Sequence, residues 1–178
     1  MTVPAIPDPP VSSMDAIAKG TRDGIVFLAN IVASLVVLVA LVSLANSILG
    51  LLPDWGSEPI SLQRLFAYVF RPVMWLIGIP GSETAAAATL MSTKTVLNEF
   101  IAYIDLSKLP ADALSPHSRL IMTYALCGFA NFGSLGILIG GMGAMVPERR
   151  REIVALGPRA ILSGTIATCM SGAVVGML

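Results

Sequence analysis

Charge is scarce in this chain of 178 residues. Asp, Glu, Lys and Arg make up only 12% of it, with 11 acidic and 11 basic side chains, whereas a soluble domain averages about 25%. A net charge of zero excludes a polybasic nucleic-acid-binding domain, so no nucleic-acid partner is expected. Hydrophobic residues reach 55% and the mean hydropathy is +0.81, which is typical of a protein embedded in a lipid bilayer.

Cysteine and histidine are equally sparse. Cys127 and Cys169 lie inside apolar runs without metal-ligand spacing, so both are expected to be buried, unreactive thiols. The single histidine, His117, falls among prolines in an expected loop. These absences leave no arrangement for metal or nucleophilic catalysis, and an enzyme that uses Glu99 alone would lack a second catalytic group. We therefore expect neither an enzyme nor a resident cofactor.

Long apolar runs are what the chain does contain. Residues 25–52 carry no charged side chain and would extend about 42 Å as a helix, more than the roughly 30 Å hydrocarbon core of a bilayer. Uncharged runs also fill most of residues 118–146 and 150–178, the former interrupted by glycines and polar residues. The sequence therefore predicts an all-α integral membrane protein with about three transmembrane helices, the second of them broken in mid-membrane.

The remaining segments are too short or too polar to cross a bilayer. Residues 1–24 predict a disordered, proline-rich lead-in and an amphipathic approach, with no cleavable signal sequence. Residues 53–81 predict a loop and an interfacial helix, because apolar residues at helical spacing alternate with arginines. Residues 82–109 form two apolar arms around a polar centre, each shorter than the roughly 20 residues that a span needs. They predict a re-entrant helical hairpin.

Three crossings would place the termini on opposite sides of the membrane. Basic residues are more numerous on the side of the N-terminus, which favours a cytoplasmic N-terminus and an exoplasmic C-terminus in the inner (plasma) membrane. The N-terminal side carries Lys19, Arg22, Arg149, Arg150, Arg151 and Arg159, and the other side carries Arg64, Arg71, Lys108 and Arg119.

The first polar cluster lies at the centre of the expected hairpin. A carboxylate such as Glu99 costs at least about 2.5 kcal/mol at bilayer depth, so it usually has a function there. Because charge-assisted hydrogen bonds are strong, a carboxylate is a good acceptor for two adjacent hydroxyls, as in a ribose. The alternative is a structural salt bridge between Glu99 and Lys94 across the hairpin tip.

The second cluster interrupts the expected broken helix. Asn131 offers a donor and an acceptor, and Ser134 adds a hydroxyl on the same face. Gly128 and Gly133 are expected to let the backbone leave the helical path, and two aromatic rings could stack on a sugar or base, those of Phe129 and Phe132. The alternative is a close-packing seam in which Asn131 bonds a neighbouring helix, lined by Gly128, Gly133, Gly136 and Gly140.

The longer motifs around these clusters resemble a known family. Residues 93–100 (TKTVLNEF) and 121–134 (IMTYALCGFANFGS) closely resemble the C-terminal half of the concentrative nucleoside transporter family, in a bacterial member. The resemblance extends over nearly all of residues 15–178. It implies a homotrimer in which each protomer moves a nucleoside across the membrane by alternating access, in symport with Na⁺ or H⁺.

The resemblance also assigns roles. Glu99 would accept from the ribose hydroxyls, Phe129, Asn131 and Ser134 would complete the ribose side of the site, and residues 25–52 would belong to a trimer scaffold. Contacts to the base and to the coupling ion are expected on a missing N-terminal half. The chain is thus either an incomplete fragment needing that half or, alternatively, a non-transporting scaffold or assembly subunit. One departure concerns the hairpin, where residues larger than the family's glycines are expected to stiffen its first arm, namely Ala88 and Ser92.

Overall fold

The computed structural model describes residues 9–53 and 59–178, and every regular element in them is a helix. This confirms the predicted all-α class for the described residues. The elements are α1 (Ser13–Leu49), α2 (Leu62–Leu76), α3 (Thr84–Val96), α4 (Glu99–Lys108), α5 (Pro116–Leu126), α6 (Phe132–Met145), the short 3₁₀ helix η1 (Pro147–Arg149) and α7 (Arg150–Val175).

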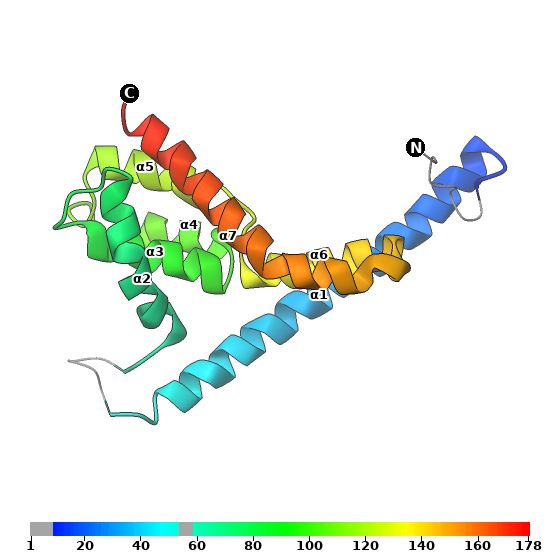
Figure 1. Ribbon diagram of the computed structural model, residues 1–178, viewed down its shortest axis with the longest axis horizontal. Helices are drawn as coiled ribbons and strands as arrows, with labels where there is room; N and C mark the ends of the chain where they lie inside the picture. Colours follow the sequence, from blue (N-terminus) through cyan, green and yellow to red (C-terminus); the bar gives the residue numbers. More distant parts are fainter. Residues whose placement is uncertain (1–8, 54–58) are drawn as a thin grey trace.

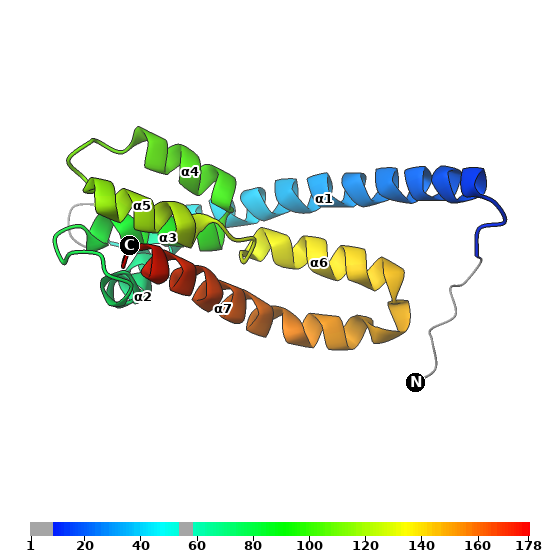
Figure 2. The same cartoon turned by 90° about the horizontal axis from the view of Figure 1, so that it is seen from above.

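The molecule is elongated. Helices α2 to α5 gather at one end, while α6 packs along α1, and the first half of α7 packs along α6, toward the other end (Figure 1). The beginning of α1 and the end of α7 therefore lie at opposite ends of the long axis, as both views show (Figure 2). The α3–α4 turn and the α5–α6 break both lie near the middle of this axis.

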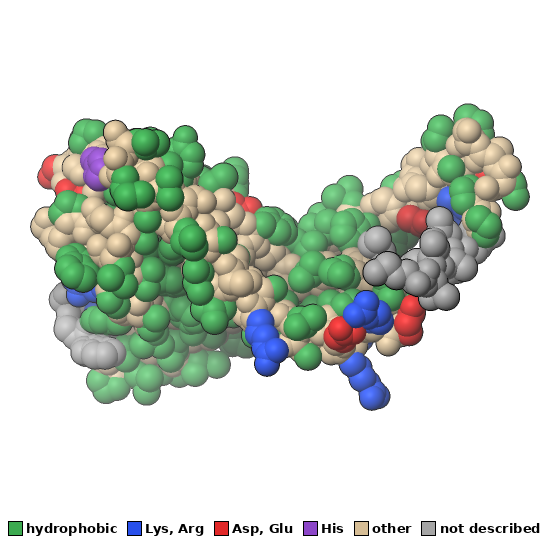
Figure 3. All heavy atoms as spheres, turned by 45° about the horizontal axis from the view of Figure 1, so that its top comes forward, with side chains coloured by type: hydrophobic (Ala, Val, Ile, Leu, Met, Phe, Trp, Pro, Cys, Tyr) green, Lys and Arg blue, Asp and Glu red, His purple; other side chains and the backbone are tan. Residues whose placement is uncertain are grey.

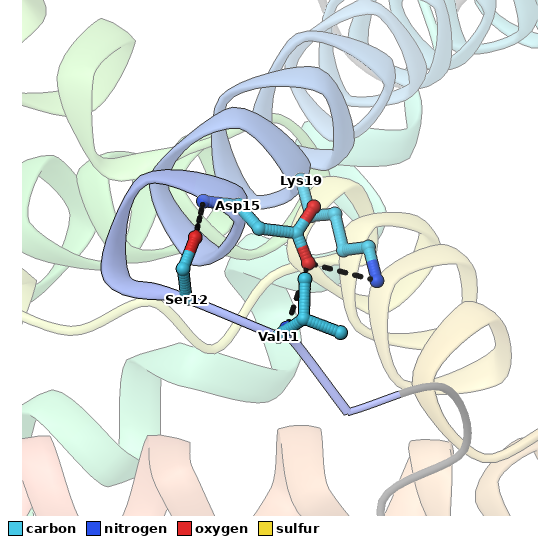
Figure 4. Close-up of polar contacts among 4 residues, drawn as sticks. All are labelled: Val11, Ser12, Asp15 and Lys19. Carbon is cyan, nitrogen blue, oxygen red and sulfur yellow. Dashed lines mark hydrogen bonds and ion pairs between the residues drawn. The ribbon is translucent and has the colours of Figure 1, made fainter.

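Helix α1 is one continuous element of 37 residues, so the amphipathic approach expected before residue 25 is its first turns rather than a separate segment. Its start is fixed by polar contacts: Ser12 Oγ accepts from the Asp15 backbone N–H at 3.1 Å, and Val11 N donates to Asp15 Oδ2 at 3.0 Å (Figure 4). Lys19 Nζ lies 3.3 Å from the same carboxylate. The predicted disordered lead-in falls largely on residues 1–8, outside the described residues.

Two helical stretches are long and apolar enough to cross a membrane by length and composition, Ser13–Leu49 and Pro147–Val175, and a shorter apolar helix covers Phe132–Gly143. Within α1 only Val42 is buried, and hydrophobic side chains cover much of the visible surface (Figure 3). So many exposed hydrophobic side chains are unusual for a soluble monomer. It fits a chain surrounded by lipid.

The core lies at the end of the molecule where α2 packs along α3 and α5 packs along α7. Glu83 ties two of these helices together just before α3 begins, because its Oε2 accepts from both N and Oγ of Ser115, each at 3.1 Å. Hydrogen bonds from Ser118 and Ser115 lower the pKa of the Glu83 carboxyl. His117 lies in the first turn of α5 rather than in a loop, and its Nε2 donates to the Gly176 carbonyl at 2.9 Å, linking α5 to the end of α7.

Candidate functional site

The first half of the site is the turn between α3 and α4. The chain reverses within Leu97 and Asn98, and Glu99 is the first residue of α4. Asn98 has an extended backbone (φ −163°, ψ 169°) and its Oδ1 accepts from Ile101 N at 2.9 Å, so it caps the helix. Glu99 therefore lies at the positive end of the α4 dipole, which favours a carboxylate there.

The second half is the break between α5 and α6. Cys127 has φ −71° and ψ 68°, and Gly128 N donates to the Leu126 carbonyl at 2.8 Å. This is an inverse γ-turn, which stops α5. Helix α6 starts again at Phe132, so residues 127–131 form the interruption. Cys127 is exposed on this turn, which corrects the expectation that both cysteines are buried; Cys169 is buried.

The glycines around the break act through close packing rather than through backbone conformation. Neither Gly128 nor Gly133 has a positive φ, which among the described glycines is found at Gly78 (φ 103°). A Cβ at Gly128 would overlap Cγ2 of Thr168 on α7. One at Gly133 would lie 3.1 Å from Cδ2 of Leu38 on α1. Gly128 does lie within the break, where its N–H closes the γ-turn, whereas Gly133 lies inside α6 and does not interrupt it.

The alternative of a glycine seam is therefore correct in part. Gly128 meets α7, and Gly133 and Gly136 face α1, but a Cβ at Gly140 would meet nothing within 4 Å. The alternative also expects a hydrogen bond from Asn131 to a neighbouring helix, and Asn131 does bond Glu99, the first residue of α4.

Asn131 and Ser134 cap α6 reciprocally. Asn131 Oδ1 accepts from Ser134 N at 2.7 Å, while Ser134 Oγ accepts from Asn131 N at 3.1 Å. This is a capping box with serine at the third helical position. Because Oδ1 is committed to the cap, the amide orientation is fixed and Nδ2 points away from α6.

Nδ2 of Asn131 donates to Oε2 of Glu99 at 2.9 Å, joining the two halves of the site. Asn131 is 1% exposed and Glu99 is half-buried. The N-termini of α4 and α6 therefore converge on one carboxylate, and both dipoles favour its charge. Within the described residues, Glu99 Oε1 makes no hydrogen bond and remains available to a ligand.

Lys94 does not form the salt bridge that the sequence left open. Its side chain is 0% exposed, and its Nζ has no hydrogen-bond partner in the part of the chain that the structure describes. Lys94 lies in the last turn of α3, where the helix dipole favours a cation. The carboxylate is held by Asn131 instead.

The two aromatic rings beside the break have different environments. Phe132 packs edge-on against Phe66 of α2 with ring centroids 5.9 Å apart. Phe129 is 60% exposed and, with Ser134, lines an apolar cavity of about 290 Å³ between α1, α6 and α7, with Phe27 on the α1 side. Of the predicted site residues, Glu99, Asn131 and Ser134 thus form one hydrogen-bonded network, and Phe129 shares the cavity with Ser134.

One buried polar residue of α7 was not predicted. Thr165 Oγ1 has no hydrogen-bond partner among the described residues, and it lies one helical turn before Cys169, the thiol that was expected to be buried. Thr165 stands in an apolar helix without a pattern, so no sequence signal distinguishes it from residues that pack.

Comparison with known proteins identifies the family. Residues 6–176 match the family described as "Na+ dependent nucleoside transporter C-terminus". The chain belongs to this family. Its relatives include an uncharacterized transporter of Haemophilus influenzae (37% identical, 94% of this chain and 42% of the relative) and the uncharacterized transporter YutK of Bacillus subtilis (39%, 92% and 41%). Human solute carrier family 28 member 3 is 36% identical over 93% of this chain and 26% of its own length.

Solved structures agree with this membership. A variant of CNTnw in its intermediate 2 state matches with a TM-score of 0.86 and 37% identity, over 96% of this chain and 43% of that one. CNTnw in an inward-facing substrate-bound state matches with a TM-score of 0.72 and 35% identity, over 96% and 42%. The chain thus spans less than half the length of each of these relatives.

Proposed function

We propose that this chain supplies the ribose-binding half of a nucleoside:cation symporter. Relatives named sodium/nucleoside cotransporter 1, 33% identical in mouse, support nucleosides as the substrate and Na⁺ as the coupling ion, with H⁺ as the alternative. Because the chain spans less than half of its relatives, contacts to the base and the coupling ion are assigned to the remaining half. The chain itself carries no catalytic role and no cofactor in this proposal.

The hydrogen bond between Asn131 and Glu99 is the observation that carries the proposal. It holds a carboxylate in place through one oxygen and leaves the other free. A free carboxylate oxygen between two helix N-termini can accept from the adjacent hydroxyls of a ribose, in bonds roughly twice as strong as neutral ones. Ser134 keeps Asn131 in position, and the exposed ring of Phe129 offers a face for the sugar or base.

The proposed membrane arrangement follows the long axis of the molecule. Helices α1, α5 with α6, and α7 would cross the bilayer, while α3 and α4 would enter and return as a re-entrant hairpin and α2 would lie at the interface. The mid-length position of the α3–α4 turn and the α5–α6 break supports this arrangement (Figure 2). The start of α1 would be cytoplasmic and the end of α7 exoplasmic, in the plasma membrane.

Alternating access is proposed as the mechanism, with α1 in a homotrimeric scaffold and the site helices in the moving part. Two states of CNTnw match this chain at similar identity but with TM-scores of 0.86 and 0.72. The same segment therefore adopts different arrangements in different states of that relative. Such a difference is what a rigid-body movement between two parts would produce.

Uridine uptake by the complete protein tests the proposal. Glu99→Gln keeps the shape of the side chain but removes its charge, and a charged hydrogen bond contributes about 1.5–3 kcal/mol, so the apparent KM should rise at least about tenfold. Glu148→Gln, at an exposed glutamate of η1, serves as the matched control and should behave as wild type. Unchanged affinity and rate in Glu99→Gln would remove this residue from the site.

The short span relative to the relatives also favours a second candidate, a non-transporting scaffold or assembly subunit. The chain alone and the chain co-expressed with the N-terminal part of the Haemophilus influenzae relative would be compared for uridine uptake. The transport proposal expects uptake only in the second case. No uptake in either case, with both parts present in the membrane, would favour the scaffold.

A further inference from the structure

Lys94 is the buried charge that the network around Glu99 leaves unexplained. Its side chain is 0% exposed, and Nζ has no hydrogen-bond partner in the described part of the chain. An unpaired charge in an apolar interior is strongly unfavourable, so such groups are retained where they act on another charge. The last turn of α3 places Lys94 five residues before Glu99, on the opposite arm of the turn.

Lys94 and Glu99 lie on either side of the α3–α4 turn. Lys94 is in the last turn of α3, and Glu99 begins α4 directly after Leu97 and Asn98. Lys94 and Glu99 form no ion pair within 4.0 Å, and the Glu99 carboxylate accepts from Asn131 instead. The two residues are thus neighbours across the turn without a direct contact.

We propose that Lys94 is a positioning residue that compensates the charge of Glu99 from a distance. The proposal rests on the proposed function, since it concerns the same carboxylate and the ribose. A direct ion pair would occupy the oxygens of Glu99 and exclude the substrate. An offset ammonium makes an ionised carboxylate less unfavourable inside the protein, yet leaves Oε1 free for a hydroxyl donor.

This arrangement has a consequence for substrate choice. The benefit of Lys94 reaches the substrate only through Glu99, and Glu99 acts only on the ribose hydroxyls. Replacing Lys94 by a neutral residue should therefore weaken the binding of a nucleoside with both hydroxyls and leave a nucleoside without them nearly unaffected. A purely structural role in the core would weaken both nucleosides equally.

The test compares the affinities of the purified complete protein for uridine and for 2′,3′-dideoxyuridine. Wild type should prefer uridine at least about tenfold, the value expected for charged hydrogen bonds. Lys94→Met should lose this preference to within about twofold, mainly through weaker uridine binding, and Lys94→Arg should restore most of it because it keeps the charge. Lys108→Gln removes an exposed lysine from the last turn of α4 and should match wild type.

The outcomes separate this inference from the proposed function. Wild type that fails to bind uridine, or binds both nucleosides alike, contradicts the proposed function and this inference with it. A second outcome overturns the inference alone. In it, wild type prefers uridine, and Lys94→Met either keeps this preference or loses affinity equally for both nucleosides. If Lys94→Met does not yield folded protein, Lys94→Gln takes its place. A Lys94→Arg protein that also loses the preference for uridine would contradict a role for the charge of Lys94.

Discussion

At the scale of single residues, Asn131 has two separate roles that mutation can divide. Its Oδ1 caps α6, while its Nδ2 donates to Glu99. Serine at this position keeps a capping oxygen but is too short to reach Glu99, whereas alanine loses both contacts. Asn131→Ala should therefore lower the free energy of unfolding by about 1 kcal/mol more than Asn131→Ser does.

Uridine binding should instead fall in both Asn131 variants, because both lose the donor to Glu99. Chemical denaturation and equilibrium binding on the same protein samples measure the two effects. Full uridine affinity in Asn131→Ser would show that the contact with Glu99 does not serve the substrate.

The two phenylalanines of the break provide a matched pair. Phe132 contacts the ring of Phe66, so Phe132→Ala should destabilise the protein by about 1–3 kcal/mol. Phe129 is 60% exposed, so Phe129→Ala should cost little stability and weaken nucleoside binding several-fold. Thermal unfolding and uridine affinity measure the two effects. A Phe132→Ala protein that loses affinity but not stability, with the opposite result for Phe129→Ala, would assign the stacking ring to Phe132.

At the scale of elements, the approach of α7 to the break depends on a missing side chain at Gly128. A Cβ there would overlap Cγ2 of Thr168, so Gly128→Ala should destabilise by about 1–3 kcal/mol. Thr168→Ser removes that methyl group and keeps the hydroxyl, so the double variant should recover most of the loss. Gly140→Ala meets nothing within 4 Å and should be neutral or slightly stabilising. No recovery in the double variant would exclude this contact as the cause.

The elements themselves were largely predictable, because each rests on local signals. Long apolar runs indicated α1 and α7, and the polar Asn98–Glu99 and Asn131–Ser134 pairs marked the places where helices restart, since asparagine caps helices well. The course of the chain at Cys127 was not predictable, because a γ-turn has no strong residue signature. The position of His117 depended likewise on a partner carbonyl at the far end of the chain.

The sequence singled out the polar residues that the structure brings together, but not the hydrogen bonds that join them. Glu99 and Asn131 stood out as polar residues in apolar surroundings, and the structure joins them directly. The sequence favoured Lys94 as the alternative partner of Glu99, but the carboxylate accepts from Asn131, which is 32 residues away in sequence. Such a choice between partners is decided by tertiary packing, and no local pattern records it.

At the scale of the whole molecule, the two interrupted elements meet near the middle of a long, lipid-facing body (Figure 2). Helix ends that point at each other inside a membrane protein leave backbone groups available where a polar solute would sit. In our proposal this chain contributes the contacts to the ribose. The part of the transporter that it does not span contributes the contacts to the base and to the coupling cation.

The most direct measurement is a double-mutant cycle on uridine affinity in the complete protein, with Glu99→Gln, Asn131→Ala and the double variant. If the two residues act on the ribose as one unit, the second mutation should cost much less once the first is present, with a coupling energy of at least about 1 kcal/mol. Losses that add to within about 0.5 kcal/mol, or no loss of affinity in either single variant, would contradict the account.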